Sequence, residues 1–116
     1  MRKFNTTEEQ IMQILWKLKK GFPKEILDDM KSPLPYNTIL STIRKLEKDK
    51  FLGFNKFGKS HQYFPLVSKK DYSKSIYRSF FRDYLGSSKE QLLSFFMEEE
   101  DIDPKEIQQL IKKIKK

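Results

Sequence analysis

Residues 35–46, PYNTILSTIRKL, open on a proline and small polar residues and end on basic ones. With Ile39 as the reference and about 100° of turn per residue, Ile43 and Leu46 fall on the same narrow stripe, as in an amphipathic helix. The opposite side of that helix carries polar and basic residues: Asn37, Ser41, Arg44, Lys45 and Lys48. The stretch therefore predicts a helix to about Asp49 that buries an apolar stripe and exposes a polar, basic face.

Two helices are predicted before this stretch. Apolar residues recur at helical spacing within residues 5–19, and the spacing of a capping box occurs twice at the start, in Asn5 with Glu8 and in Thr6 with Glu9. Pro23 suits the first turn of a second, short helix, whose inward side is Ile26, Leu27 and Met30. The SPLP segment at residues 32–35 must end that helix, because proline disfavours helix at the preceding residue.

Two strand-like runs follow, at residues 52–57 and 61–66, and Gly58, Lys59 and Ser60 connect them as a hairpin. Phe54 and Tyr63 are the aromatic residues expected to point inward. Three helices followed by a two-stranded ribbon with a basic turn is the order of a winged helix-turn-helix domain. The expected fold class is mostly α (α+β), with the winged helix at residues 1–70 and a helical region at residues 71–116.

The second region contains three further predicted helices, at residues 71–85, 88–99 and 104–114. These roughly 45 residues carry more apolar side chains than a piece of that size can bury alone. A second copy of the chain is the simplest partner surface, so we expect a homodimer. The predicted interface consists of Ile76, Tyr77, Phe80, Phe81, Tyr84, Leu92, Phe95, Phe96, Leu110 and Ile114.

The charge is distributed unevenly along the 116 residues, whose net charge is +8. Up to Tyr72 there are 15 Lys and Arg against 8 Asp and Glu, whereas the rest has 9 against 8. A basic first part favours an anionic partner. No apolar run of membrane-spanning length and no signal-peptide pattern occur, and cysteine is absent, so we expect a soluble cytoplasmic protein without disulfides or membrane insertion.

The residues needed for catalysis are scarce. There is one histidine, His61, and no serine and aspartate pattern accompanies it. The four glycines are isolated, so no glycine-rich phosphate loop is present. We therefore predict no enzyme, no metal site and no cofactor.

The exposed face of the 36–48 helix instead suits double-stranded DNA. Exposed basic residues on a helix are most often only solvated, but here small hydrogen-bonding residues begin the helix and a basic hairpin follows it. Asparagine pairs with adenine and arginine with guanine in the major groove, whereas lysine contacts phosphates. The expected base-reading residues are Asn37, Thr38, Ser41 and Arg44. The expected phosphate contacts are Tyr36, Lys45, Lys48, Lys56 and Lys59, although Tyr36 is equally compatible with packing under the connection.

Four segments resemble the penicillinase-repressor family of bacterial winged-helix transcriptional regulators, the BlaI/MecI/CopY proteins. YNTILSTIRKLEKDKFL at residues 36–52 resembles the third-helix motif of that family, and YFPLVSKKDY at residues 63–72 resembles its exit from the wing. FFRDYLGSSKEQLL at residues 80–93 and IMQILW at residues 11–16 resemble two further segments, in the same order. The resemblance implies a homodimeric repressor whose winged helices bind the half-sites of a palindromic operator.

Three departures from the family pattern bear on mechanism. Lys50 stands where the family usually has the glycine that ends the third helix, which requires either a different turn or a left-handed lysine. Copper-responsive members release DNA through cysteine motifs, which this chain lacks. β-Lactam-responsive members are cut at an Asn-Phe bond by a pathway that starts at a membrane sensor. The resemblance places that cleavage region at Phe95 and Phe96, where the asparagine is missing.

The leading hypothesis is a DNA-binding repressor of an antibiotic-resistance or cell-envelope operon, with a membrane sensor and protease pathway as a further partner. Two alternatives belong to other classes. One is a sequence-indifferent architectural DNA-binding protein that uses the same charges. The other is a protein-interaction module whose aromatic tail docks a different protein.

Overall fold

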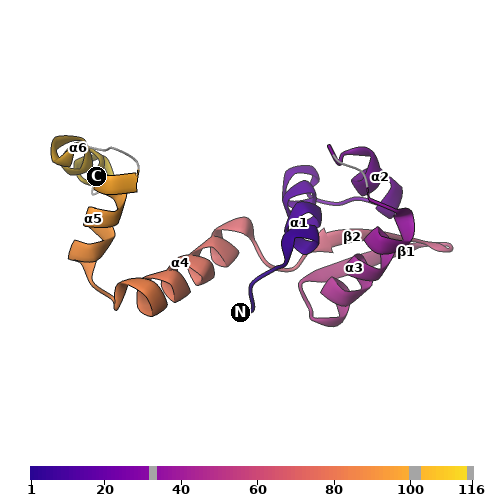
Figure 1. The fold of residues 1–116 in the computed structure, drawn as a ribbon. Coiled ribbons are helices and arrows are strands. Elements are labelled where there is room, and N and C mark those ends of the chain that lie inside the picture. Colours follow the sequence, from indigo (N-terminus) through magenta and orange to yellow (C-terminus); the bar gives the residue numbers. More distant parts are fainter. Residues whose placement is uncertain (32–33, 100–102, 115–116) are drawn as a thin grey trace. The chain divides into compact units, whose positions relative to one another are not determined.

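The computed structural model describes residues 1–31, 34–99 and 103–114, except for the side chains of residues 104, 107, 110, 111 and 114. Its elements are α1 (Thr6–Leu18), α2 (Pro23–Asp28), α3 (Tyr36–Lys48), β1 (Leu52–Phe57), β2 (Ser60–Pro65), α4 (Lys69–Leu85), α5 (Lys89–Glu99) and α6 (Pro104–Ile114) (Figure 1). They form two compact units, Met1–Ser75 and Ile76–Lys116. The first unit extends past the boundary at residue 70 expected from the sequence, because α4 begins inside it.

The core of the first unit joins α1, α2 and α3. Its fully buried side chains include the predicted stripe of α3, and the set is Ile11, Met12, Leu15, Ile26, Ile39, Ile43, Leu46 and Leu52. Burial of one such side chain contributes about 1.5–3 kcal/mol relative to leaving it exposed. The helical periodicity of the sequence thus identified the packed face of each of the first three helices.

The hairpin connection is one residue shorter than predicted. β1 and β2 pair antiparallel from Leu52 opposite Pro65 to Phe57 opposite Ser60, so that only Gly58 and Lys59 form the turn. Gly58 has φ of 61°, which glycine adopts without strain. Ser60 is therefore a strand residue and does not belong to the loop.

The two aromatic residues predicted to point into the core differ in burial. They face each other across the ribbon, yet Tyr63 is buried and Phe54 is 41% exposed. The cause is a second partner of β2: the backbone of Gly21 exchanges both hydrogen bonds with Tyr63, at 2.9 and 2.8 Å. β2 is therefore covered on both edges, whereas β1 is the outer strand, and the inward expectation for Phe54 is wrong.

The end of α3 decides between the alternatives left open for Lys50. Lys50 has φ of 67°. The Phe51 amide donates to the Leu46 carbonyl at 2.9 Å and the Lys50 amide to the Glu47 carbonyl at 3.0 Å, which is the hydrogen-bond pattern of a Schellman motif. The lysine therefore occupies a left-handed position that usually belongs to glycine.

Substitution of Lys50 by glycine should stabilise the protein. Lys50→Gly is expected to raise the free energy of unfolding by about 1 kcal/mol, because a left-handed non-glycine residue costs roughly that much. Thermal denaturation would then shift upward by about 4–8 °C. The control is Lys48→Gly within the helix, which should lose about 1 kcal/mol. An unchanged or lower midpoint for Lys50→Gly would contradict the strain.

The N-terminal segment closes the core through contacts with residues distant in sequence. Asn5 caps α1 in a capping box with Glu8, as one of the two predicted pairs requires. Arg2 donates to both carboxylate oxygens of Glu8, at 2.9 and 2.7 Å, and also to Asp49. The Phe4 ring stacks on the Tyr72 ring with a centroid distance of 4.2 Å. These contacts connect the N-terminus to the end of α3 and the start of α4.

The second unit contains aromatic contacts but little burial. The rings of Phe80 and Phe95 meet edge to face at 5.7 Å between α4 and α5. No residue of α5 is buried, and Tyr84 is 77% exposed. Ser88 caps α5, because its hydroxyl accepts a hydrogen bond from the Gln91 amide at 3.2 Å.

Candidate nucleic-acid interface

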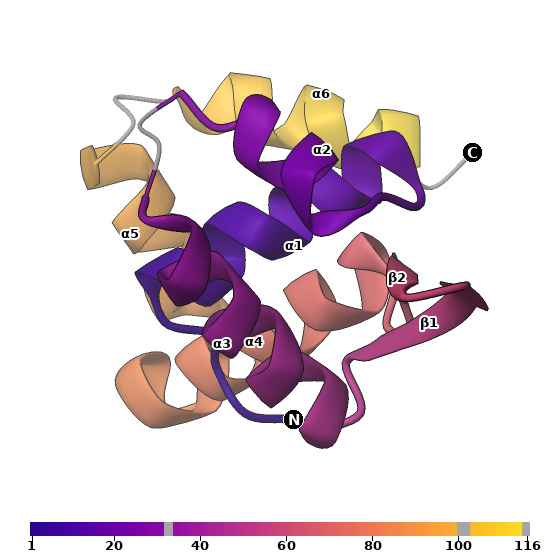
Figure 2. The same cartoon turned by 90° about the vertical axis from the view of Figure 1, so that its right-hand side faces the viewer.

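The solvent-facing side of α3 presents a central stripe of polar and basic side chains. Asn37, Ser41, Arg44 and Lys48 are all exposed and lie opposite the buried stripe of this helix. Figure 2 shows α3 in front, with the β1–β2 hairpin extending to its right. The packing of Ile39, Ile43 and Leu46 fixes the rotation of the helix, so this stripe cannot turn inward without loss of the core.

Two other predicted DNA residues of α3 lie beside this stripe. Thr38 and Lys45 are exposed. The Thr38 carbonyl accepts hydrogen bonds from the hydroxyls of Ser41, at 3.0 Å, and Thr42, at 2.7 Å. The pKa of the buried Glu8 carboxyl is lowered mainly by its hydrogen bonds from Arg2, and the charge of Lys45 also lowers it. The Ser41 hydroxyl is thus bound to its own helix in this structure, which no pattern in the sequence indicates.

Tyr36 lies on the other flank of α3, next to the hairpin. Its side chain is 39% exposed, so it is neither fully packed under the connection nor free of the protein surface. Burial raises the pKa of the Tyr63 phenol, and the charges of Glu47 and Arg44 act on it in opposite directions. α3 packs against β1, so the exposed side of the helix adjoins the ribbon.

The hairpin adds two exposed lysines to this surface. Lys56 lies opposite His61 in the ladder, and Lys59 lies in the turn. The imidazole ring of His61 is stacked on Phe54 at 4.4 Å. His61 is thus a ribbon residue held by an aromatic neighbour, beside the two lysines.

The basic residues of this surface are not neutralised within the described chain. Among the residues that the structure describes, ion pairs join Arg2 to Glu8 and Asp49, Lys17 to Asp29, and Arg82 to Asp83. None of the predicted DNA contacts takes part in them: Arg44, Lys45, Lys48, Lys56 and Lys59. Their positive charge is available to an external anion.

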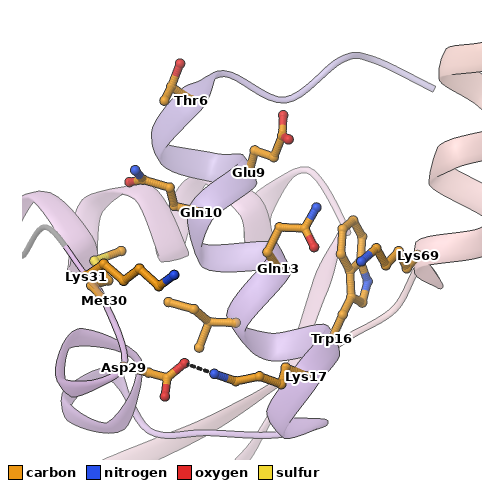
Figure 3. A pocket seen from close by; sticks show the side chains of 11 residues that line it. Thr6, Glu9, Gln10, Gln13, Trp16, Lys17, Asp29, Met30, Lys31 and Lys69 are labelled. Atoms are coloured by element: carbon orange, nitrogen blue, oxygen red, sulfur yellow. Dashed lines mark hydrogen bonds and ion pairs between the residues drawn. The ribbon is translucent and has the colours of Figure 1, made fainter. Parts of the chain in front are cut away.

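A cleft of about 740 Å³ lies elsewhere, along the exposed side of α1 (Figure 3). Trp16 and Gln13 line it together with Lys69, and the Lys17–Asp29 ion pair lies at one end. The Trp16 indole N–H donates to the Val67 carbonyl at 2.9 Å, which fixes the ring. The cleft contains none of the residues predicted to bind DNA.

Metal-binding clusters and membrane-spanning helices are both absent from the part of the chain that the structure describes. Within residues 1–31, 34–99 and 103–114, no group of His, Asp or Glu side chains has an arrangement that would hold a metal ion. Over the same residues, every helix is too short or too polar to cross a membrane.

The helix pair α2 and α3, in which α3 exposes one face, and the basic two-stranded ribbon that follows it are typical of the winged-helix class of proteins. The family profile of the penicillinase repressor matches residues 4–116, and the chain belongs to this family. Both the expected fold class and the resemblance seen in the sequence are thereby confirmed. Members of this family are regulators, which supports the expectation that the chain is not an enzyme.

Individual relatives agree with the family. The methicillin resistance regulatory protein MecI of Mammaliicoccus sciuri is 26% identical over 108 residues, which is 91% of this chain and 88% of the relative. MecI of Staphylococcus epidermidis matches equally well. The solution structure of the DNA-binding domain of the repressor BlaI is similar with a TM-score of 0.54 and 25% identity, over 62% of this chain and 94% of that domain.

Proposed function

We propose that this protein is a homodimeric transcriptional repressor that binds a palindromic operator in double-stranded DNA and acts in the cytoplasm. The observation that carries the proposal is the unneutralised basic and polar surface of α3 and the hairpin, on a domain similar to the DNA-binding domain of BlaI. In this proposal α3 enters the major groove, where Asn37, Thr38, Ser41 and Arg44 read bases. The regulated genes would form an antibiotic-resistance or cell-envelope operon.

The dimer is supported by the exposure of the second unit. Five of its large apolar side chains are more than a third exposed in the single chain: Tyr77, Tyr84, Leu93, Phe95 and Phe96. Of the predicted interface, Ile76, Phe80, Phe81 and Leu92 are half-buried, and the side chains of Leu110 and Ile114 lie outside the described residues. A second copy would cover this apolar surface and space two winged helices for two half-sites.

The release step is a separate part of the proposal. A pathway from a membrane sensor to a protease would act near Phe95 and Phe96, which are 39% and 41% exposed. Conversion of the chain to two fragments in cells treated with a β-lactam would support this route. An intact chain in cells that nevertheless express the regulated genes would exclude it.

The deciding experiment is selection of bound DNA from a random pool at about 150 mM salt, where non-specific phosphate binding is already weak. A palindrome with half-sites about one helical turn apart would support the proposal. Binding without an enriched motif would instead favour an architectural protein, and absence of binding would favour a protein-interaction module.

Arg44→Ala should relax base preference at one position of each half-site. We expect a loss of discrimination of about 1–3 kcal/mol there, because a bidentate arginine contact to guanine is worth that much. The measurement is a repeat of the selection with the variant. An unchanged motif would remove Arg44 from the residues that read bases.

Lys59→Ala should act on all sequences alike. Since Lys59 is expected to contact a phosphate, its loss should lower the slope of log affinity against log salt by about one unit per site. Titrations of the selected duplex and of a scrambled duplex at several salt concentrations measure this. A change confined to the selected duplex would assign Lys59 a base contact instead.

A further inference from the structure

The tip of the hairpin combines an exposed aromatic ring with two positive charges. Phe57 is 56% exposed, and it stands between Lys56 and the turn residue Lys59. A ring so exposed is poorly placed for stabilising the domain, because over half of its surface remains in water. The positive charges of the flanking lysines attract this tip to polyanions.

The Phe57 ring is nevertheless held in place. It lies on the ribbon face of its partner Ser60, opposite the face of Phe54 and Tyr63. The ring of Phe22 contacts it edge to face, with a centroid distance of 5.7 Å and an interplanar angle of 65°. Because one side of the ring rests on Phe22, little side-chain entropy remains to be lost when the other side is covered.

Gly58, next to Phe57, leaves the tip narrow. A side chain added there would meet no atom within 4 Å, so the space around this residue is open. A glycine at such a tip allows another surface to approach the backbone closely. The tip therefore offers one apolar group, supported on one side by Phe22, between two lysines.

We propose that Phe57 is an apolar wedge that the hairpin places against a base step of the minor groove, where it unstacks the step and bends the duplex. This inference rests on the proposed function, in which α3 occupies the major groove and the neighbouring hairpin meets the adjoining minor groove. Lys56 and Lys59 would contact phosphates on the walls of that groove, which is about 6 Å wide. Insertion of apolar side chains from the minor-groove side kinks duplexes by about 20–90°.

The wedge makes Phe57 a source of specificity without any hydrogen bond to a base. Pyrimidine–purine steps unstack most easily, so a wedge favours sequences that carry such a step at the contacted position. Phe22 is a positioning residue in this arrangement, because it touches the ring of Phe57 and not the DNA.

The test uses the full chain and the duplex bound most tightly in the random-pool selection. The bend angle is measured by gel mobility with the site placed at different positions along a fragment, and unstacking by fluorescence of 2-aminopurine at the flanking steps. For the wild type we expect a bend and increased fluorescence at one step per half-site. Phe57→Ala should abolish both and weaken binding by about tenfold to a hundredfold, while Phe57→Leu should retain part of the bend.

Two variants serve as matched controls. Phe54→Ala removes an aromatic ring of similar exposure from the other face of the ribbon and should leave the bend intact. Lys59→Ala should lower the salt slope, whereas Phe57→Ala should leave that slope unchanged, because it removes no charge. A Phe57→Ala protein that retains the wild-type bend and affinity would overturn the wedge. Failure of the wild type to bind any duplex would overturn the proposed function, and the wedge with it.

Discussion

The Tyr84→Asp, Phe96→Asp double variant is expected to be a monomer and to lose most of its affinity for the operator. Tyr84 is 77% and Phe96 41% exposed in the single chain, where each ring contacts one neighbouring ring, that of Phe80 or Phe95. In a dimer interface both carboxylates would be buried among apolar groups, at a cost of several kcal/mol without a partner. Because the operator is expected to engage two winged helices, loss of the dimer should weaken specific binding by about a thousandfold or more.

Sedimentation and operator titration of the same samples measure this. The control is the Ser79→Asp, Ser94→Asp double variant, which adds the same charges to α4 and α5 beside the aromatic positions. It should remain dimeric and should bind as the wild type does. A Tyr84→Asp, Phe96→Asp protein that sediments as a dimer would refute the assignment of these residues to the interface.

Among the substitutions predicted here, Glu8→Ala is expected to produce the largest loss of stability. The Glu8 carboxylate is 1% exposed and accepts from Arg2 and from the Asn5 amide. Its removal leaves the Asn5 amide without this acceptor and takes from Arg2 one of its two carboxylate partners. Loss of one partner from a fully buried ion pair costs about 3–5 kcal/mol. Because Arg2 is partly exposed and keeps Asp49, we expect about 3 kcal/mol, measured by urea denaturation. The control Asp49→Asn, on the exposed arm, should cost less than about 1 kcal/mol.

The free energy of unfolding should also depend on pH through the Glu8 carboxylate. The hydrogen bonds from Arg2 are the main reason why the pKa of Glu8 is lowered, against the opposing effect of burial. A carboxyl whose pKa is lower in the folded state stabilises fully above its unfolded pKa of about 4.3, and the contribution is lost as pH falls toward the folded value. Glu8→Gln should therefore flatten the loss of stability below about pH 5 relative to the wild type. An equal loss of stability between about pH 5 and lower pH in the wild type and in Glu8→Gln would contradict this.

The sequence predicted what local periodicity controls. The buried stripe of α3, the capping box at Asn5 and the existence of the hairpin each depend on residues a few positions apart, and each was found. The prediction failed where pairing with a backbone segment distant in sequence determines which side chains are buried. Nothing near Phe54 indicates that Gly21 pairs with the far edge of β2, yet that pairing makes β1 the outer strand.

The candidate site was predictable to a similar depth. The exposed face of α3 follows from its buried face, so Asn37 and Arg44 could be placed on it from the sequence. The contact between Phe22 and Phe57 joins residues separated by the whole of α2 and α3, and no local pattern signals it. The sequence does contain a signal for the hairpin tip, because an aromatic residue stands between Lys56 and Lys59. The prediction of phosphate contacts there used only the charges of the two lysines.

The contact of Phe4 with Tyr72 also bears on synthesis of the protein in the cell. The Phe4 amide donates to the Tyr72 hydroxyl at 2.8 Å, and 68 positions of sequence separate the two residues. A chain growing from the ribosome exposes its N-terminus first and folds as its partners emerge. The contacts of Phe4 with Tyr72 can therefore form only after the start of α4 has left the exit tunnel. A transcript broken before codon 72 would yield a winged helix in which the Phe4 ring lacks its stacking partner Tyr72 and is more open to solvent and to quality-control proteases.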